Sequence, residues 1–227
     1  MDTKISDNYQ RILSQIAAAC QRAGRDPKEV TLVAVSKTVD LPQIATAIDA
    51  GIHNFGENRT NLFAQRESAY PQEHWHFIGS IQTNKVRDFV GKAQLVHSVA
   101  SVRALAAIAR RAQALGVVQR VLVEVNVSGE ESKDGVAPEG LDEILDAAAD
   151  HEGIEVRGLM TMAPLADEHT VRGVFRQLRE LRDSYVASYQ AAGRIQLHEL
   201  SMGMSQDFAL AVEEGATIVR IGRSIWQ

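Results

Sequence analysis

Apolar positions recur along the chain with two periods, one typical of amphipathic helices and the other of buried strands. Ile5, Ile12 and Ile16 fall on one helical face, which predicts a helix over residues 5–23. The β-branched, apolar run over residues 31–35 has the length of a strand. The same alternation continues to the end of the chain. The expected strands cover residues 31–35, 53–55, 75–78, 95–97, 120–126, 154–159, 195–200 and 217–221, and the expected helices cover residues 5–23, 41–50, 58–69, 82–91, 101–115, 138–149, 168–189 and 205–214.

Strands that alternate with helices form parallel sheets through right-handed crossovers. Eight such units in a chain of 227 residues are the number that closes a (β/α)8 TIM barrel of the α/β class. We therefore expect residues 1–227 to form a single barrel domain, with an open doubly wound sheet as the alternative. Only residues 222–227 follow the eighth strand, so the extra N-terminal helix is expected to take the place of the helix after that strand.

Composition narrows the partners and the compartment. The 24 Lys and Arg residues against 29 Asp and Glu residues give a net charge of −5, which argues against nucleic acid or an anionic membrane as partner. A single cysteine, Cys20, allows no intrachain disulfide and fits a reducing cytoplasm. The N-terminus lacks the apolar core of a signal peptide, and no window reaches the roughly 20 apolar residues of a membrane span. We expect a cytoplasmic protein.

Chemistry in such barrels is built at the C-terminal ends of the strands. Lys37 follows the first strand directly, and the period of two places it on the same face as Val33 and Val35. If that face points into the barrel, the amine lies at the barrel mouth, partly desolvated, as a free amine that attacks carbonyls. The alternative from spacing alone is a lysine that lays its stem on apolar surface and extends its amine into water.

The loop after the seventh strand offers a place for a phosphate, as it does in many barrels. Ser201 and Ser205 supply hydroxyls on either side of the flexible Gly203. The free N–H groups at the start of the expected helix 205–214 add further donors. A helix cap at Ser205 with a tight turn at Gly203 is the alternative.

The loop after the eighth strand completes this pattern. Gly222 allows close approach of the backbone, and Arg223 adds a charge or another N–H. Together with Lys37, the two loops make an aldehyde that carries a phosphate the simplest ligand.

Six segments, in order through nearly the whole chain, resemble the YggS/PROSC family of pyridoxal phosphate homeostasis proteins. They are VAVSKT (33–38), FGEN (55–58), HWHFIGSIQTNK (74–85), GLMTMAP (158–164), LSMGMS (200–205) and VRIG (219–222). The resemblance implies a barrel like the N-terminal domain of alanine racemase and of eukaryotic ornithine decarboxylase. It implies pyridoxal 5'-phosphate (PLP) as the cofactor, held as a Schiff base on Lys37, with Arg220 facing the pyridine nitrogen and Asn58 close to the ring. The phosphate ligands it implies are Ser201 and the backbone at Gly222 and Arg223, with Ser205 nearby.

Bound PLP does not by itself imply catalysis. An arginine beside the ring nitrogen disfavours protonation of that nitrogen, because two cations repel, and this weakens the cofactor as an electron sink. Racemization also needs a base on each face of the ring, and Lys37 supplies only one. The related racemases take the second base, a tyrosine, from another domain. None of the four tyrosines here lies at the C-terminal end of an expected strand; they are Tyr9, Tyr70, Tyr185 and Tyr189.

We therefore expect a PLP carrier or buffer that acts in PLP homeostasis without robust catalysis and has no catalytic residue. PLP-dependent apoenzymes are candidate recipients of the cofactor, and the chain is expected to be a monomer. One alternative is a small PLP-dependent enzyme, an amino-acid racemase or lyase. A second is an aldolase-type barrel that acts on a sugar phosphate through Lys37 without PLP.

Two other polar groups remain for interpretation. His74 and His76 lie on one strand face, but no third ligand stands at a suitable spacing, which favours packed histidines and no metal site. Glu199 is a further polar residue of the seventh strand, and the pattern leaves open whether it pairs with Arg220.

Overall fold

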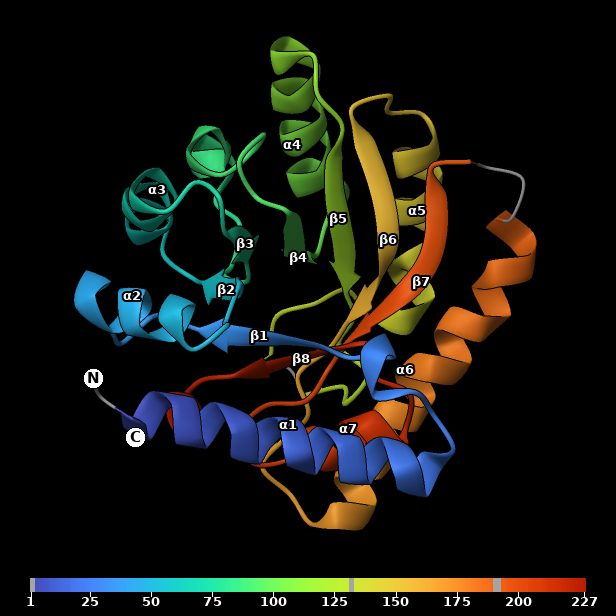
Figure 1. Ribbon diagram of the computed structural model, residues 1–227. Helices are drawn as coiled ribbons and strands as arrows, with labels where there is room; N and C mark the ends of the chain where they lie inside the picture. Colours follow the sequence, from blue (N-terminus) through green and yellow to red (C-terminus); the bar gives the residue numbers. More distant parts are fainter. Residues whose placement is uncertain (1–2, 131–132, 190–192) are drawn as a thin grey trace.

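The strands form one closed sheet around a central axis (Figure 1). A computed structural model describes residues 3–130, 133–189 and 193–227. All neighbouring strands are parallel and follow chain order, and β1 pairs with β8 to close the barrel. Closure confirms the (β/α)8 expectation and excludes the open sheet. The strands are β1 (Thr31–Val35), β2 (Asn54–Glu57), β3 (His74–Phe77), β4 (Leu95–Val99), β5 (Gln119–Glu124), β6 (Ile154–Met160), β7 (Ile195–Ser201) and β8 (Ile218–Ile221).

Helices surround this sheet in an outer ring (Figure 1). They are α1 (Thr3–Ala23), α2 (Leu41–Asp49), α3 (Thr60–Ala69), α4 (Val102–Leu115), α5 (Leu141–Ala149), α6 (Glu168–Tyr189), α7 (Phe208–Glu213) and α8 (Arg223–Trp226). The described residues also form the short 3-10 helices η1 (Pro27–Glu29), η2 (Thr83–Asp88) and η3 (Pro138–Gly140). In the described part of the chain, no helix combines the length and apolar character needed to cross a membrane.

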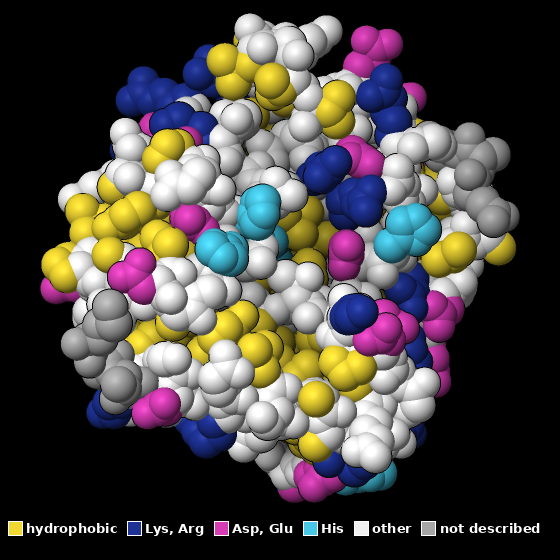
Figure 2. Space-filling model, viewed as in Figure 1, with side chains coloured by type: hydrophobic (Ala, Val, Ile, Leu, Met, Phe, Trp, Pro, Cys, Tyr) yellow, Lys and Arg dark blue, Asp and Glu magenta, His cyan; other side chains and the backbone are white. Residues whose placement is uncertain are grey.

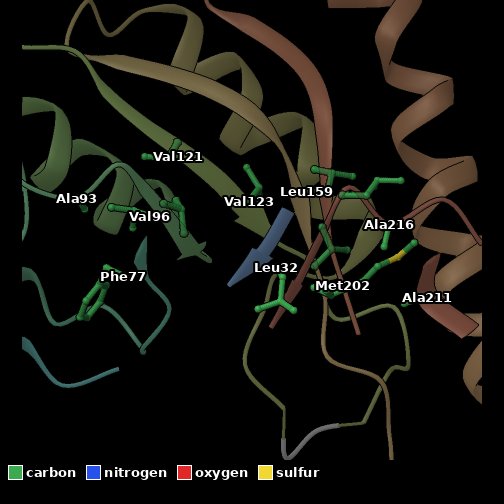
Figure 3. Close-up of a cluster of buried hydrophobic side chains, with 14 of the residues drawn as sticks. Leu32, Phe77, Ala93, Val96, Val121, Val123, Leu159, Met202, Ala211 and Ala216 are labelled. Carbon is green, nitrogen blue, oxygen red and sulfur yellow. The ribbon is translucent and has the colours of Figure 1, made fainter. Parts of the chain in front are cut away.

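Strand alternation divides the apolar side chains into two layers. Leu122 of β5 belongs to a small cluster inside the barrel, which Val33, Met160 and others complete. Its neighbours Val121 and Val123 point outward into the larger core between sheet and helices, part of which Figure 3 shows. Burial of each aliphatic side chain contributes about 2 kcal/mol to stability, so each strand keeps the orientation that buries both layers. This orientation determines which side chains at the strand ends point into the barrel.

The N-terminal helix α1 completes the outer ring. It lies between α7 and α2, the place expected for the helix after the eighth strand. Its buried face includes Ile12 and Ile16, in agreement with the periodicity. One point differs from the sequence expectation: the chain after β8 forms the one-turn helix α8, which packs on α1. Trp226 of α8 donates its indole N–H to the Val35 carbonyl at 2.7 Å and so ties the chain end to β1.

Two expected helices are wrong in type or extent. Residues 82–91 contain only the short 3-10 helix η2. Val86, Phe89 and Val90 are buried, but the backbone leaves helical geometry at Phe89 and turns at Gly91, which has φ +82°, so the segment does not form the expected longer α-helix. The helix expected over 205–214 begins only at Phe208. Before it, a turn follows Gly203, which has φ +92°, and Asp207 accepts the N–H of Met204 at 2.6 Å. Ser205 is therefore not at a helix N-terminus.

Candidate functional site

A cavity of about 320 Å³ opens at the C-terminal end of the barrel, among the segments that follow β1, β6, β7 and β8. This volume lies at the lower end of the range of about 300–1,000 Å³ that is typical of small-molecule sites. Five of the seven candidate residues line this cavity: Lys37, Ser205, Arg220, Gly222 and Arg223. Its charged wall residues are Lys37, Arg220, Arg223 and Asp207, three cations against one carboxylate. This local excess of positive charge, on a chain of net charge −5, favours an anionic ligand.

Lys37 reaches the cavity by the alternation expected from the sequence. Val33 points into the barrel, and Val35, two residues on, lines the cavity together with Lys37. The expected desolvation is wrong, however, because the Lys37 side chain is exposed. No hydrogen bond or ion pair joins its amine to the described residues. Lys37 therefore places an accessible amino group at the edge of the cavity.

A buried ion pair holds the segment that carries Lys37. Glu57, at the end of β2, pairs with Arg66 of α3, and both side chains are almost fully buried. Ser36 donates its hydroxyl to Glu57 at 3.3 Å, and Arg66 donates to the Val39 carbonyl. The residues on either side of Lys37 and Thr38 are thereby fixed. The sequence motif FGEN contains Glu57, but its partner stands on another element and has no local signal.

Arg220 of β8 forms the polar floor of the cavity. Its side chain is only 4% exposed. One Nη donates to Ser201 Oγ at 2.6 Å and the other to the Thr161 carbonyl at 3.0 Å. Burial lowers the pKa of Arg220 to about 10, and the charges of Glu124 and Asp207 act in the opposite direction. Arg220 therefore stays a cation at neutral pH, with a fixed orientation.

The two serines of the LSMGMS segment lie in different places. Ser205 lines the cavity, and its Oγ accepts the backbone N–H of Gly222 at 3.3 Å. Ser201 is fully buried and lies behind Arg220 instead of on the cavity wall. Its second partner is His97, whose Nδ1 is 2.8 Å from Ser201 Oγ. The geometry therefore does not bring Ser201 to the phosphate contact that the resemblance implies.

Asn58 also lies outside the cavity wall. It is exposed after β2, and its backbone N–H is bound to the Glu57 carboxylate at 2.8 Å. Its backbone packs closely on Gly79, where a Cβ would lie 2.1 Å from the Asn58 carbonyl oxygen. The expected contact of Asn58 with a ring is not supported by this geometry.

Glu124 is the acidic neighbour of Arg220 that the sequence did not single out as a site. It ends β5 on the interior face and is 4% exposed. Burial raises its pKa to about 7, with Asp134 adding to the rise and Arg220 opposing it. Glu199, whose pairing with Arg220 was left open, instead accepts the Thr217 hydroxyl at 2.5 Å and lines a second cavity at the opposite end of the barrel.

The two histidines considered as metal ligands differ in exposure and do not form a metal site with other described residues. His74 is exposed and His76 is buried, and no group of three metal-ligating side chains exists among the residues that the structure describes. His76 instead contacts His97 within the barrel.

The closed parallel barrel, with a lysine after its first strand and an arginine on its last, defines the class of the alanine racemase N-terminal domain. The family model described as "Alanine racemase, N-terminal domain" matches residues 8–227. The pyridoxal phosphate homeostasis protein of Aquifex aeolicus is 44% identical over 219 residues, which cover 95% of this chain and 94% of that protein. The chain belongs to the pyridoxal phosphate homeostasis protein family, which confirms the resemblance drawn from the sequence.

Solved structures agree with this assignment. A crystal structure of a protein from Bifidobacterium adolescentis superposes with a TM-score of 0.90 at 38% identity, over 98% of this chain and 94% of that one. PipY of Synechococcus elongatus PCC7942, solved with PLP bound, superposes with a TM-score of 0.79 at 32% identity. That match covers 93% of this chain and 100% of the PipY chain.

Proposed function

We propose that this protein binds PLP through a Schiff base between Lys37 Nζ and the aldehyde of the cofactor, with loss of water. In this proposal it acts in PLP homeostasis as a carrier or buffer without robust catalysis. The observation that carries the proposal is the cavity that Lys37 lines together with the cations Arg220 and Arg223. The bound PLP of the PipY relative supports the choice of ligand.

The residues present fit the cofactor. The accessible amine of Lys37 suits an aldehyde, and the surplus of positive charge suits a phosphate. Ser205 accepts the Gly222 N–H and so keeps its own hydroxyl proton to donate to a phosphate oxygen. We assign the phosphate to Ser205 and Arg223 at the Gly222 turn, where the Gly222 N–H itself is donated to Ser205. Ser201 and Asn58 are left out of the set for the reasons given above.

Arg220 supports a holding role over a catalytic one. In PLP enzymes the cofactor supplies an electron sink, whose strength depends on protonation of the ring nitrogen. Arg220 is the buried cation on the cavity floor, and we assign it to the pyridine nitrogen. A fixed cation at that position disfavours a second positive charge on the ring.

The groups at the cavity that could transfer protons also favour a holding role over a catalytic one. None of the four tyrosines lines the cavity, and Tyr70, for example, donates its hydroxyl to the Leu41 carbonyl at 3.2 Å. Among the described residues of the cavity wall, Asp207 is the one carboxylate that could serve as a base beside Lys37. Burial raises the pKa of Asp207, although its carboxylate accepts the Met204 N–H. The alternative, a racemase or lyase, therefore requires Asp207 to serve as the second base.

The visible absorption spectrum separates these functions. We expect a band when the purified protein is mixed with PLP, its loss in Lys37→Ala, and its retention in Lys28→Ala, which removes a lysine in η1 outside the cavity. Chiral analysis after incubation with L-alanine should show no turnover. Robust turnover that depends on Lys37 would establish the enzyme instead, with Asp207→Asn as the variant that tests its second base. If wild-type protein gives no band, PLP is not the ligand, and trapping of a sugar phosphate on Lys37 by borohydride would indicate the aldolase-type barrel.

For the carrier itself, the measurement is transfer. PLP-loaded protein is mixed with a PLP-dependent apoenzyme, the recipient class we propose, and recovery of that enzyme's activity is followed. A carrier restores activity without first releasing all its PLP to the buffer, whereas no recovery would leave only a buffering role.

A further inference from the structure

A row of polar side chains crosses the inside of the barrel from one end to the other. His76 Nε2 is 3.3 Å from Asn54 Oδ1, and His76 Nδ1 is 2.9 Å from His97 Nε2. His97 Nδ1 is 2.8 Å from Ser201 Oγ, which accepts from Arg220 Nη1 at 2.6 Å. These contacts join β2, β3, β4, β7 and β8 through residues that are far apart in the sequence.

The row connects two cavities. Asn54 and His76 line a cavity of about 150 Å³ at the N-terminal end of the barrel, and Arg220 lines the cavity of Lys37 at the other end. Figure 2 shows basic, acidic and histidine side chains gathered around the middle of one barrel face. Between the ends, His97 and Ser201 are fully buried, so water does not compete for their hydrogen bonds.

The direction of the hydrogen bonds follows from counting donors. Burial lowers the pKa of His76 to about 3 and that of His97 well below its ordinary value, so both rings are neutral and carry one N–H each. Asn54 Oδ1 accepts, so His76 donates from Nε2 and accepts at Nδ1. His97 then donates from Nε2 and accepts at Nδ1, which receives the hydroxyl proton of Ser201.

The contacts at the Arg220 end of the row give the same direction for the hydrogen bonds. Arg220 has only donors, so Ser201 Oγ accepts from it. If His97 Nδ1 also donated to Ser201, the serine proton would have no acceptor, because His97 and Arg220 are the only partners of Ser201 Oγ within the described ranges. An unsatisfied donor on a fully buried hydroxyl is strongly unfavourable.

We propose that His97, oriented by His76, is a positioning residue that turns the Ser201 proton inward and thereby fixes the guanidinium of Arg220 on the floor of the Lys37 cavity. This role rests on the proposed function, in which that floor faces the cofactor ring. It also gives Ser201 a task different from phosphate binding, because its only proton is committed to His97.

The first test needs no cofactor. Two-dimensional NMR of protein with ¹⁵N-labelled histidine, recorded without PLP, reports which ring nitrogen carries the proton. We expect both His76 and His97 as neutral Nε2–H tautomers. Nδ1–H signals on both rings would reverse the row and overturn the proposal, whether or not the protein binds PLP.

The second test uses variants loaded with PLP. His97→Leu removes the acceptor for Ser201, and we expect PLP to bind about tenfold more weakly, the equivalent of one net hydrogen bond, with a shifted visible band. His97→Asn places an amide oxygen near the former Nδ1 and should restore most of the affinity and the wild-type band. His74→Leu, an exposed histidine on the same strand as His76, is the matched control and should change neither.

The outcomes of the two tests are distinguishable. Equal affinity and an unshifted band in His97→Leu would overturn the positioning role even if the tautomers are as expected. If His97→Leu does not fold, two measurements still test the positioning role. They are the tautomers of the wild-type protein and the visible band of His97→Asn, which should match wild type because its amide oxygen accepts the Ser201 proton. Failure of wild-type protein to bind PLP would defeat the proposed function and leave the tautomer result standing.

Discussion

Glu124→Gln tests whether the barrel interior holds a carboxyl group whose pKa is raised by burial. Glu124 is 4% exposed at the inner end of β5, and burial is the main reason that its pKa rises from 4.5 to about 7. Between these two values, the folded protein retains a proton that the unfolded chain has already released. Glutamine has nearly the same shape and no proton to lose, so the variant isolates this titration.

The sign and the size follow from proton linkage. Where the folded state binds more protons than the unfolded state, the free energy of unfolding falls as pH rises. For Glu124 that window runs from about pH 4.5 to about pH 7, and the gap between the two pKa values corresponds to a loss of about 3 kcal/mol. Below the window both states are protonated and the contribution of Glu124 is intact; above it the loss is complete.

Urea unfolding of wild-type protein and Glu124→Gln, measured from pH 4.5 to pH 8, provides the assay. The variant should become more stable relative to wild type as pH rises, by about 3 kcal/mol over this range. Glu139→Gln, at an exposed carboxyl in η3, is the control and should give a constant difference. A constant difference for Glu124→Gln as well would refute the reasoning, and a trend of opposite sign would mean that pairing with Arg220 outweighs burial.

Two further substitutions test how the sheet and the Lys37 segment are held. Gly158→Ala would place a Cβ 1.9 Å from the backbone oxygen of Glu199 on the next strand, so we expect a loss of about 3 kcal/mol in urea unfolding; Gly173→Ala, in open space on α6, should instead gain about 1 kcal/mol, and equal effects would contradict this view. Glu57→Gln removes the charge that pairs with buried Arg66, so unfolding should cost about 4 kcal/mol less and PLP binding should weaken; a change below about 1 kcal/mol would show that the pair is dispensable.

Long periodic segments were predictable because their burial pattern is local. β1 and α6 occupy the predicted residues 31–35 and 168–189 without change. The pattern failed over residues 82–91, although Val86, Phe89 and Val90 are all buried, because the backbone leaves helical geometry at Phe89 and turns at Gly91. It also failed where a turn competes with a helix, as before α7, whose start is delayed by the Asp207 contact with the Met204 N–H.

The residues of the candidate site also differ in how far local sequence patterns predict their positions. Lys37, Arg220 and Gly222 reach one cavity because closure of a parallel barrel brings all C-terminal strand ends together. The position of Ser201 behind Arg220 depends instead on strand register, and the β6–β7 pair carries a register shift that no hydrophobic period reveals. His97 contacts Ser201 across 104 positions in the chain, so no local motif indicates their hydrogen bond.

Two of the three cationic side chains at the cavity, Lys37 and Arg220, differ in exposure and in hydrogen bonding, and this contrast bears on the choice between a carrier and an enzyme. Lys37 is exposed and unpaired among the described residues, so a ligand reaches it without rearrangement of the barrel. Arg220 is buried and bound by both Ser201 and the Thr161 carbonyl, so it cannot turn to relay a proton without breaking two hydrogen bonds. An enzyme needs groups that can move protons near the reacting carbon. A carrier needs an accessible group for covalent attachment and a rigid binding site. The arrangement of Lys37 and Arg220 thus supports the carrier that we propose.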